Sequence, residues 1–330
     1  MNATINLENK HFPVLLNELE SIISPLYGGT FIDCTFGQGG YSKKILDYRL
    51  NKVIALDRDP SVKTYSNALL KKYKNRFSFQ NIKFSEINKI NTDNLKGIIF
   101  DLGYSINQIK NLEMGLSFNS KGKLNMKMGL NNFSSHEVIS SMSKENLEKI
   151  FKYLGEEKFS KTIASRLSKE RENKTINTED LINIIERVKP RSNKKINKST
   201  QIFQSLRIFV NKEISELING LINAYNILPI GGVIAVVSFH SIEDKITKFF
   251  FNNYSKNENS SRYFPSKIKN NKFFKINQKK PITPSKEEID LNPPSRSSKL
   301  RYGIKIKNNC DFSELREKFK YLTDIENLKF

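Results

Sequence analysis

The chain has 330 residues, of which 38% are hydrophobic and 11% aromatic, a composition too apolar for a chain that is disordered throughout. No apolar run approaches the ~18–20 residues of a membrane span, and the polar N-terminus shows no secretory signal. Its two cysteines, Cys34 and Cys310, exclude a disulfide scaffold and a four-thiolate metal site. These features predict a cytoplasmic protein.

The net charge narrows the class of partner. The chain carries 55 lysine and arginine residues against 34 acidic residues, which leaves a formal net charge of +21. Such an excess favours a polyanionic partner, either nucleic acid or an anionic membrane surface. The abundance of lysine, asparagine and isoleucine can also reflect a coding bias of the genome, so the charge alone does not identify the partner.

The first hundred residues alternate between predicted strands and helices. Predicted helices cover 13–24, 41–48 and 61–74, and predicted strands cover 30–33, 52–56, 77–84 and 97–100. Asp59, beside Pro60, is the candidate cap of the third helix. The alternation predicts an α/β fold built on a doubly wound parallel sheet.

A loop and a run of helices then interrupt the strands. The loop covers 107–132, and helices are predicted over 143–154, 156–169 and 178–188, followed by one long helix whose apolar stripe runs from Ile202 to Leu221. Strand character returns over 233–239, where the near-continuous apolar run is typical of a strand buried on both faces. Residues 300–306 alternate like a late strand.

This order predicts a helical domain inserted into a sheet domain. The expected division is 1–108 and 213–330 for the sheet domain and 109–212 for the insert. Within the second part, residues 252–294 are polar and basic, and we expect a loose, flexible segment there.

A glycine-bearing turn follows the first predicted strand. Gly37, Gly39 and Gly40 lie at its carboxyl end, the edge of a doubly wound sheet at which ligands bind. Asp57 ends the second strand, 24 residues after Asp33, and can accept hydrogen bonds from both hydroxyls of a ribose. The turn lacks the last spaced glycine of a pyrophosphate fingerprint, which favours S-adenosylmethionine over a nicotinamide dinucleotide. A tight structural turn and a helix-capping Asp57 are the alternative interpretations.

Two further strand ends carry polar side chains. Asp101 ends the fourth strand, where it could contact the cofactor, accept a hydrogen bond from a substrate amino group, or cap a loop. After the last buried strand, Ser241 and Asp244 have the spacing of a capping box. His240 beside them could contact RNA or substrate. Because the chain has three histidines and no Cys/His cluster, we expect no metal site.

Two basic stretches are candidates for phosphate contact. Residues 187–198 hold six lysines and arginines, and residues 262–280 hold seven, with no acid in either stretch. Aromatic residues that could stack on unpaired bases are interleaved with the second stretch: Tyr263, Phe264, Phe273 and Phe274. A charge run is often only a solvated face, but two of them beside a cofactor edge favour RNA contact.

Segments in order from residue 11 to about residue 306 resemble the bacterial 16S rRNA cytosine-N(4)-methyltransferases, the RsmH or MraW family. The matching segments are HFPVLLNE from His11, FIDCTFGQGGYS from Phe31, ALDRDP from Ala55, FDLGYS from Phe100, GLSF from Gly115, LGEEKFSKTIA from Leu154, TQIFQSLRIFVNKE from Thr200, SFHSIED from Ser238 and NPPSRSSKLR from Asn292. The resemblance implies a Rossmann-like class I S-adenosylmethionine-dependent methyltransferase sheet with an inserted all-helical domain.

The resemblance also implies a set of site residues. Cofactor contacts are implied for Gly39, Gly40, Tyr41, Asp57, Phe84, Asp101 and Gln108, with the Phe84 ring packing on adenine. Some positions depart from the family pattern: Tyr41 replaces histidine, Ile106-Asn107 replaces Ser-Pro, Asn125 replaces aspartate, and Pro294-Ser295 interrupts the usual basic Arg-Ala before Arg296. The Asn125 departure bears on catalytic rate rather than on fold.

The implied activity is methylation of the exocyclic N(4) amine of a cytidine in 16S rRNA, with the small ribosomal subunit as partner and no membrane partner. Asp101 is the candidate acceptor for the amine, and Asn125 and His240 are further catalytic candidates. Two alternatives remain open: a non-catalytic ribosome-assembly factor with the same fold, motivated by Asn125 and Tyr41, and an amino-methyltransferase acting on another nucleic acid. A nicotinamide-dependent dehydrogenase is a more distant alternative. The sequence leaves open whether the protein is a monomer or a homodimer.

Overall fold

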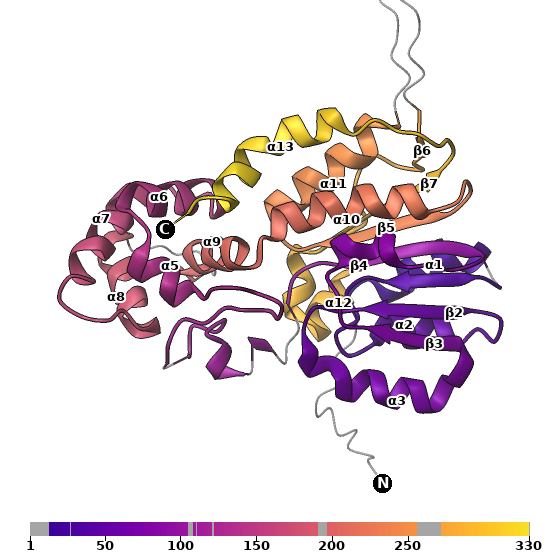
Figure 1. Cartoon of the computed structure of the whole chain (residues 1–330), viewed down its shortest axis with the longest axis horizontal. Helices are drawn as coiled ribbons and strands as arrows, with labels where there is room; N and C mark the ends of the chain where they lie inside the picture. Colours follow the sequence, from indigo (N-terminus) through magenta and orange to yellow (C-terminus); the bar gives the residue numbers. More distant parts are fainter. Residues whose placement is uncertain are drawn as a thin grey trace, which may run out of the picture.

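The computed structural model describes residues 13–26, 28–104, 108–109, 111–120, 122–190, 197–255 and 272–329. Its strands form one seven-stranded sheet in the order β3-β2-β1-β4-β5-β7-β6 (Figure 1). The strands are β1 Thr30–Asp33, β2 Lys52–Leu56, β3 Phe77–Gln80, β4 Leu95–Asp101, β5 Val233–Ser238, β6 Phe274–Lys275 and β7 Lys299–Lys305. The first five are parallel, and β7 runs antiparallel to β5 and β6. The predicted doubly wound sheet is confirmed.

Helices pack on both faces of this sheet. Those that pack around it are α1 Leu16–Ile23, α2 Gly40–Leu46, α3 Lys63–Tyr73, α10 Glu213–Ile227, α11 Ser241–Asn253, α12 Lys286–Leu291 and α13 Ser313–Glu326. Successive strand residues point to opposite faces, so Phe31 packs with α1, α2 and α3, whereas Ile32 packs with α10, α11 and α13. All the residues of β1 and β5 are buried, as expected for strands covered on both sides.

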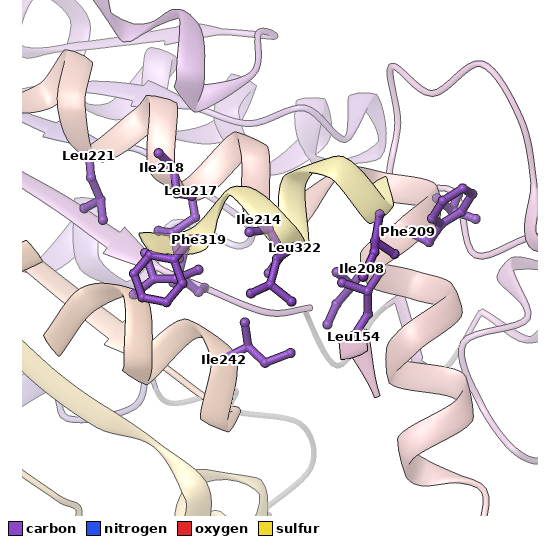
Figure 2. Close-up of a cluster of buried hydrophobic side chains, with 14 of the residues drawn as sticks. Leu154, Ile208, Phe209, Ile214, Leu217, Ile218, Leu221, Ile242, Phe319 and Leu322 are labelled. Atoms are coloured by element: carbon purple, nitrogen blue, oxygen red, sulfur yellow. The ribbon is translucent and has the colours of Figure 1, made fainter. Parts of the chain in front are cut away.

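The remaining helices lie beyond one edge of the sheet, on the left of Figure 1. They are α5 Ser135–Ser141, α6 Lys144–Lys149, α7 Ser160–Glu170, α8 Thr178–Val188 and α9 Thr200–Asn211, with a π-helical turn at Ile150–Leu154. The predicted helix over 143–154 therefore changes hydrogen-bond pattern halfway. The hydrophobic core is continuous from the sheet into these helices, because α13 spans both regions (Figure 2). Phe319 and Leu322 of α13 pack between α9, α10 and α11.

The expected long helix from Ile202 to Leu221 is wrong, because the chain breaks at Lys212 into α9 and α10. Lys212 has φ 53°, a left-handed conformation that ends the first helix and redirects the second. The buried carboxylate of Glu326, at the end of α13, accepts hydrogen bonds from Ile214 N (2.7 Å) and Ser215 N (2.8 Å). A distant residue therefore caps α10, which its apolar stripe could not reveal.

Several shorter predictions are adjusted. Strand β3 ends at Gln80, and Phe84 opens a 3₁₀ turn rather than extending the strand. Asp59 caps the turn at Pro60 as expected, accepting a hydrogen bond from Ser61 N at 2.8 Å. Within the expected loose segment 252–294 the structure forms the short elements β6 and α12. Residues 256–271 lie outside the described part, and the expected flexibility stays a prediction. None of the helices in the described ranges is long and apolar enough to cross a membrane.

We predict that Glu326→Ala lowers the free energy of unfolding by about 2 kcal/mol, because it leaves buried N–H groups at the start of α10 without an acceptor. Urea denaturation followed by circular dichroism measures the change. Glu317→Ala is the matched control, since Glu317 lies exposed on the same helix. An equal effect of the two substitutions would show that the cap contributes no stability.

Candidate active site

Three carboxylates gather at the carboxyl edge of the sheet. Asp33 ends β1, Asp101 ends the neighbouring β4, and Asp57 directly follows β2 on the other side of β1. Since the carboxyl ends of parallel strands meet at one edge, the topology brings together residues that are up to 68 positions apart (101 − 33). Ligands of open α/β sheets bind at this edge.

Asp33 is the structural member of this group. Its side chain is fully buried and accepts hydrogen bonds from Ser42 Oγ (2.6 Å) and Thr35 N (3.3 Å), so it joins β1 to the glycine turn and to α2. Burial raises the pKa of Asp33 to about 6, although these hydrogen bonds oppose the shift. The sequence offered Asp33 only as a strand end.

Asp57 faces the turn. One carboxylate oxygen accepts Gly37 N–H and the other accepts Asp59 N–H, both at 2.8 Å. Burial raises the pKa of Asp57 to about 6. Each oxygen keeps a free lone pair, so the carboxylate can still accept two donors from a ligand.

Asp101 is the most perturbed acid of the three. Burial and the negative charges of Asp33 and Glu243 raise its pKa well above the usual range of an aspartate. Its Oδ1 atom is buried and has no hydrogen-bond partner among the described residues. An orphaned buried acceptor of this kind indicates a place for a ligand donor.

One cavity of about 620 Å³ opens over this edge. It brings together most of the predicted site residues: Gly40, Tyr41, Asp57, Phe84, Asp101, Gln108 and His240. Its opposite wall comes from the loop before α5 and from α9, through Met126, Met128 and Phe203. The cavity is therefore enclosed jointly by the sheet edge and the helical region.

Two predicted site residues do not line this cavity. Gly39 has φ +75°, and a Cβ there would lie 2.7 Å from the Phe36 ring, so this glycine serves the turn and its packing. Asn125 is the neighbour of Met126, which lines the cavity. Its carbonyl accepts Ser135 N–H at 3.0 Å, and its buried Oδ1 has no hydrogen-bond partner among the described residues. The catalytic and binding roles assigned from sequence remain predictions.

The departure at Tyr41 has a local structural explanation. The buried Tyr41 hydroxyl donates a hydrogen bond to the carbonyl of Val14, which ties α2 to the segment before α1. Gly40 beside it packs so closely on Pro13 that a Cβ would lie 2.1 Å from that ring. Tyr41 therefore contributes a wall of the cavity and a fixed hydroxyl.

Arg58, which our sequence analysis missed, joins the two walls. Its guanidinium donates to Gly129 O (3.1 Å), Asn131 Oδ1 (3.0 Å) and Asn211 O (2.9 Å), so it links the end of β2 to the loop and to the last residue of α9. On the same side, Gln108 Nε2 donates to Asp59 Oδ2 at 2.7 Å. The only sequence signal was the position of this arginine between Asp57 and Asp59.

Arg207 is a second missed residue on the cavity wall. Glu213 accepts two hydrogen bonds from its guanidinium, at 2.8 and 2.9 Å, and the Tyr104 ring lies 4.8 Å from its central carbon. Although burial lowers the pKa of Arg207, Glu213 raises it overall. The ligand atoms of Glu213, His240 and Glu243 lie within 4.8 Å of one another, but the pairing with Arg207 occupies Glu213, which makes this an ion-pair cluster.

The expected Ser241–Asp244 capping box is wrong, because His240 caps α11 instead. Its ring accepts Glu243 N–H, while the Glu243 carboxylate accepts Phe239 N–H and His240 N–H. Asp244 instead pairs with Lys299 (2.8 Å) and Arg301 (2.7 Å) of β7.

The basic stretches only partly match the expected RNA surface. Lys189 is held by Glu157 at 2.6 Å and by Lys198 O at 2.7 Å, so it stabilises the fold; 191–196 lie outside the described residues. Phe273 and Phe274 were expected to stack on bases, but both are buried against Tyr225. Tyr263 and Phe264 lie outside the described residues.

Comparison with known proteins identifies the family of this chain. The model of the MraW methylase family matches residues 8–306. A protein of Bartonella quintana named Ribosomal RNA small subunit methyltransferase H is 38% identical over 94% of this chain and 96% of its own length. A protein of the same name from Agrobacterium fabrum is 40% identical over 90% of this chain and 87% of its own. An rRNA methylase structure from Streptococcus thermophilus aligns over 91% of this chain and 99% of its own, with 10% identity and a TM-score of 0.37.

We predict that the stability that Asp33 contributes depends on pH. Because its folded pKa of about 6 exceeds the ordinary 3.8, this contribution is fully present below about pH 3.8 and is lost as the pH rises through 6. The unfolding free energy of the wild type relative to Asp33→Asn should fall by a few kcal/mol between pH 4.5 and 7.5, at roughly 1.4 kcal/mol per pKa unit. Urea titrations measure it, with exposed Asp47→Asn as control. A pH-independent difference would contradict the shift.

Proposed function

This chain belongs to the MraW methylase family and is an S-adenosylmethionine-dependent methyltransferase, and we propose that its substrate is the exocyclic N(4) amine of a cytidine in small-subunit rRNA. The observation that carries the proposal is the orphaned, buried Oδ1 of Asp101 in the wall of the shared cavity. A carboxylate oxygen there is an acceptor without a donor, as an amine substrate requires.

The sheet edge fits the cofactor. Asp57 keeps free lone pairs for two ribose hydroxyls. The Phe84 ring lines the cavity and is fixed edge-on against Phe100, with ring centroids 5.4 Å apart, so it offers a rigid apolar surface to adenine. Gly40 lines the cavity, and its missing side chain lets Pro13 pack directly on the turn. The acidic edge also suits a sulfonium cation.

In the proposed mechanism, the chain's residues position the amine and remove its proton. The bound cofactor supplies an electrophilic methyl group, so that an N–C bond forms as the S–C bond breaks and leaves a thioether. Because the lone pair of N(4) is delocalised into the ring, alignment of the amine is the main requirement. Asp101 accepts a hydrogen bond from N(4) and then its proton, and a raised pKa makes a carboxylate a stronger base.

The finer features of the assignment are part of the proposal. The target base leaves its stack to enter the cavity, and the sheet edge and helical region hold it from opposite sides. We propose the assembled small subunit as the substrate and the cytoplasm as the compartment. The division into 1–108, 109–212 and 213–330 also remains a proposal, since the hydrophobic core runs across its boundaries.

The decisive experiment supplies labelled S-adenosylmethionine and small ribosomal subunits from a strain lacking this gene. We expect one cytidine to gain the label on N(4), identified by mass spectrometry of the nucleosides. A label on another base or RNA would support an amino-methyltransferase of different specificity. Binding of cofactor and subunit without any transfer would support the non-catalytic assembly factor.

We predict that Asp101→Asn lowers kcat by about 100-fold or more, because the amide accepts a hydrogen bond but cannot take the proton. In the wild type, kcat should rise with pH as Asp101 ionises, above the usual range of an aspartate, and the variant should lose this rise. Single-turnover rates from pH 5.5 to 9 measure both effects, and calorimetry checks that the affinity for S-adenosylhomocysteine stays within about threefold. A variant with wild-type kcat would exclude Asp101 as the proton acceptor.

A further inference from the structure

Asp101 and His240 lie at the ends of neighbouring strands. Asp101 pairs in register with Val237 of β5, and Leu102 N donates to Val237 O at 2.9 Å, so the chain leaves both strands side by side. A Cβ on Gly103 would lie 3.3 Å from the Phe239 ring, which shows that the segments following β4 and β5 remain in contact. His240 follows Phe239 directly, and both His240 and Asp101 line the cavity.

The hydrogen bonds of His240 define which ring nitrogen is the donor. Nδ1 accepts Glu243 N–H at 3.5 Å as the cap of α11. In the neutral ring, an accepting Nδ1 leaves the proton on Nε2. The side chain is 10% exposed, and its Nε2 lies 3.1 Å from Glu243 Oε1, within ion-pair distance when the ring is protonated. By geometry, however, Nε2 makes no hydrogen bond to Glu243 or to another described residue.

The cavity wall therefore carries one orphaned acceptor and one orphaned donor. Ten buried side-chain atoms lack a hydrogen-bond partner among the described residues, and two of them belong to residues that line this cavity. Their shared position points to a ligand that satisfies both. The ligand must present a donor next to an acceptor. Cytosine does so through its N(4)–H and its ring N3, whereas uracil and guanine present the reverse order at the corresponding edge. Adenine shares the cytosine order, so the choice of cytosine rests on the proposed function.

We propose that His240 and Asp101 together recognise this edge of the target base, with His240 Nε2–H donating to N3 and Asp101 Oδ1 accepting from N(4). His240 then determines specificity and holds the amine in place, while Asp101 receives the proton. Recognition by both atoms fixes the rotation of the base in its plane, which a single hydrogen bond to the amine cannot do. The capping bond to Glu243 in turn fixes the orientation of the imidazole.

Two substitutions separate the cap from the donor. His240→Asn keeps an acceptor for Glu243 N–H, since asparagine is a strong N-cap, but has no donor at the place of Nε2. His240→Gln puts an amide donor close to that place and lacks the ring acceptor. We expect His240→Asn to lower kcat/KM for the subunit by roughly 10- to 100-fold and His240→Gln to recover at least part of it. Thermal unfolding and S-adenosylhomocysteine affinity should stay near wild type for His240→Asn.

The sharpest test combines the variant with a modified base. Subunits are reassembled with 3-deazacytidine, which lacks the N3 acceptor, at the nucleotide that the wild type methylates. We expect the wild type to lose roughly 10- to 100-fold in kcat/KM on this substrate and His240→Asn to lose little further. Equal losses for both proteins, or full activity of His240→Asn on cytidine, would overturn the role of His240. A wild type that methylates no cytidine would instead overturn the proposed function, and this inference with it.

Discussion

The site depends on the side chain of Arg58, because its hydrogen bonds connect the sheet edge to the helical region. Its three hydrogen bonds end on Gly129, Asn131 and Asn211, in the loop and the helix that also supply the opposite wall of the cavity. Burial lowers the pKa of Arg58, and a buried guanidinium is tolerated only where acceptors replace its water. The Asn211 side chain continues this network: it donates a hydrogen bond to Met126 O and accepts one from Met128 N. Both methionines line the cavity.

The second constraint is the contrast between the local charge and the net charge. The chain has a formal net charge of +21, yet its cavity contains Asp57 and Asp101 above the buried Asp33. Burial raises the pKa of all three aspartates. Basic residues line the same cavity, among them Arg58, whose charge acts on Asp57, and Arg207, which pairs with Glu213. The cavity therefore mixes charges of both signs and does not follow the net charge of the chain.

Much of the fold could be predicted because local patterns decide it. Strands β1 and β2 have the predicted ends, since apolar runs bounded by glycine and aspartate leave little freedom in register. The long helix through Lys212 was wrong because an apolar stripe of constant period does not show a left-handed residue within it. Phe273 and Phe274 were misassigned for a related reason: an aromatic residue in a basic stretch has the same sequence signature whether it stacks on a base or fills a core.

The sequence by itself determined which residues stand at the sheet edge, because a strand end and a glycine turn are local features that also place Asp57 and Asp101. Only the tertiary structure decided what faces them. Arg58 acts through partners up to 153 positions away, which no spacing rule connects. The cap formed by His240 and Glu243 does follow a local spacing, shifted by one residue from the expected Ser241–Asp244 pair. Chain topology determines the edge, whereas packing between distant segments determines which polar atoms of the described residues remain unpaired there, and these are the atoms to which we assign the proposed chemistry.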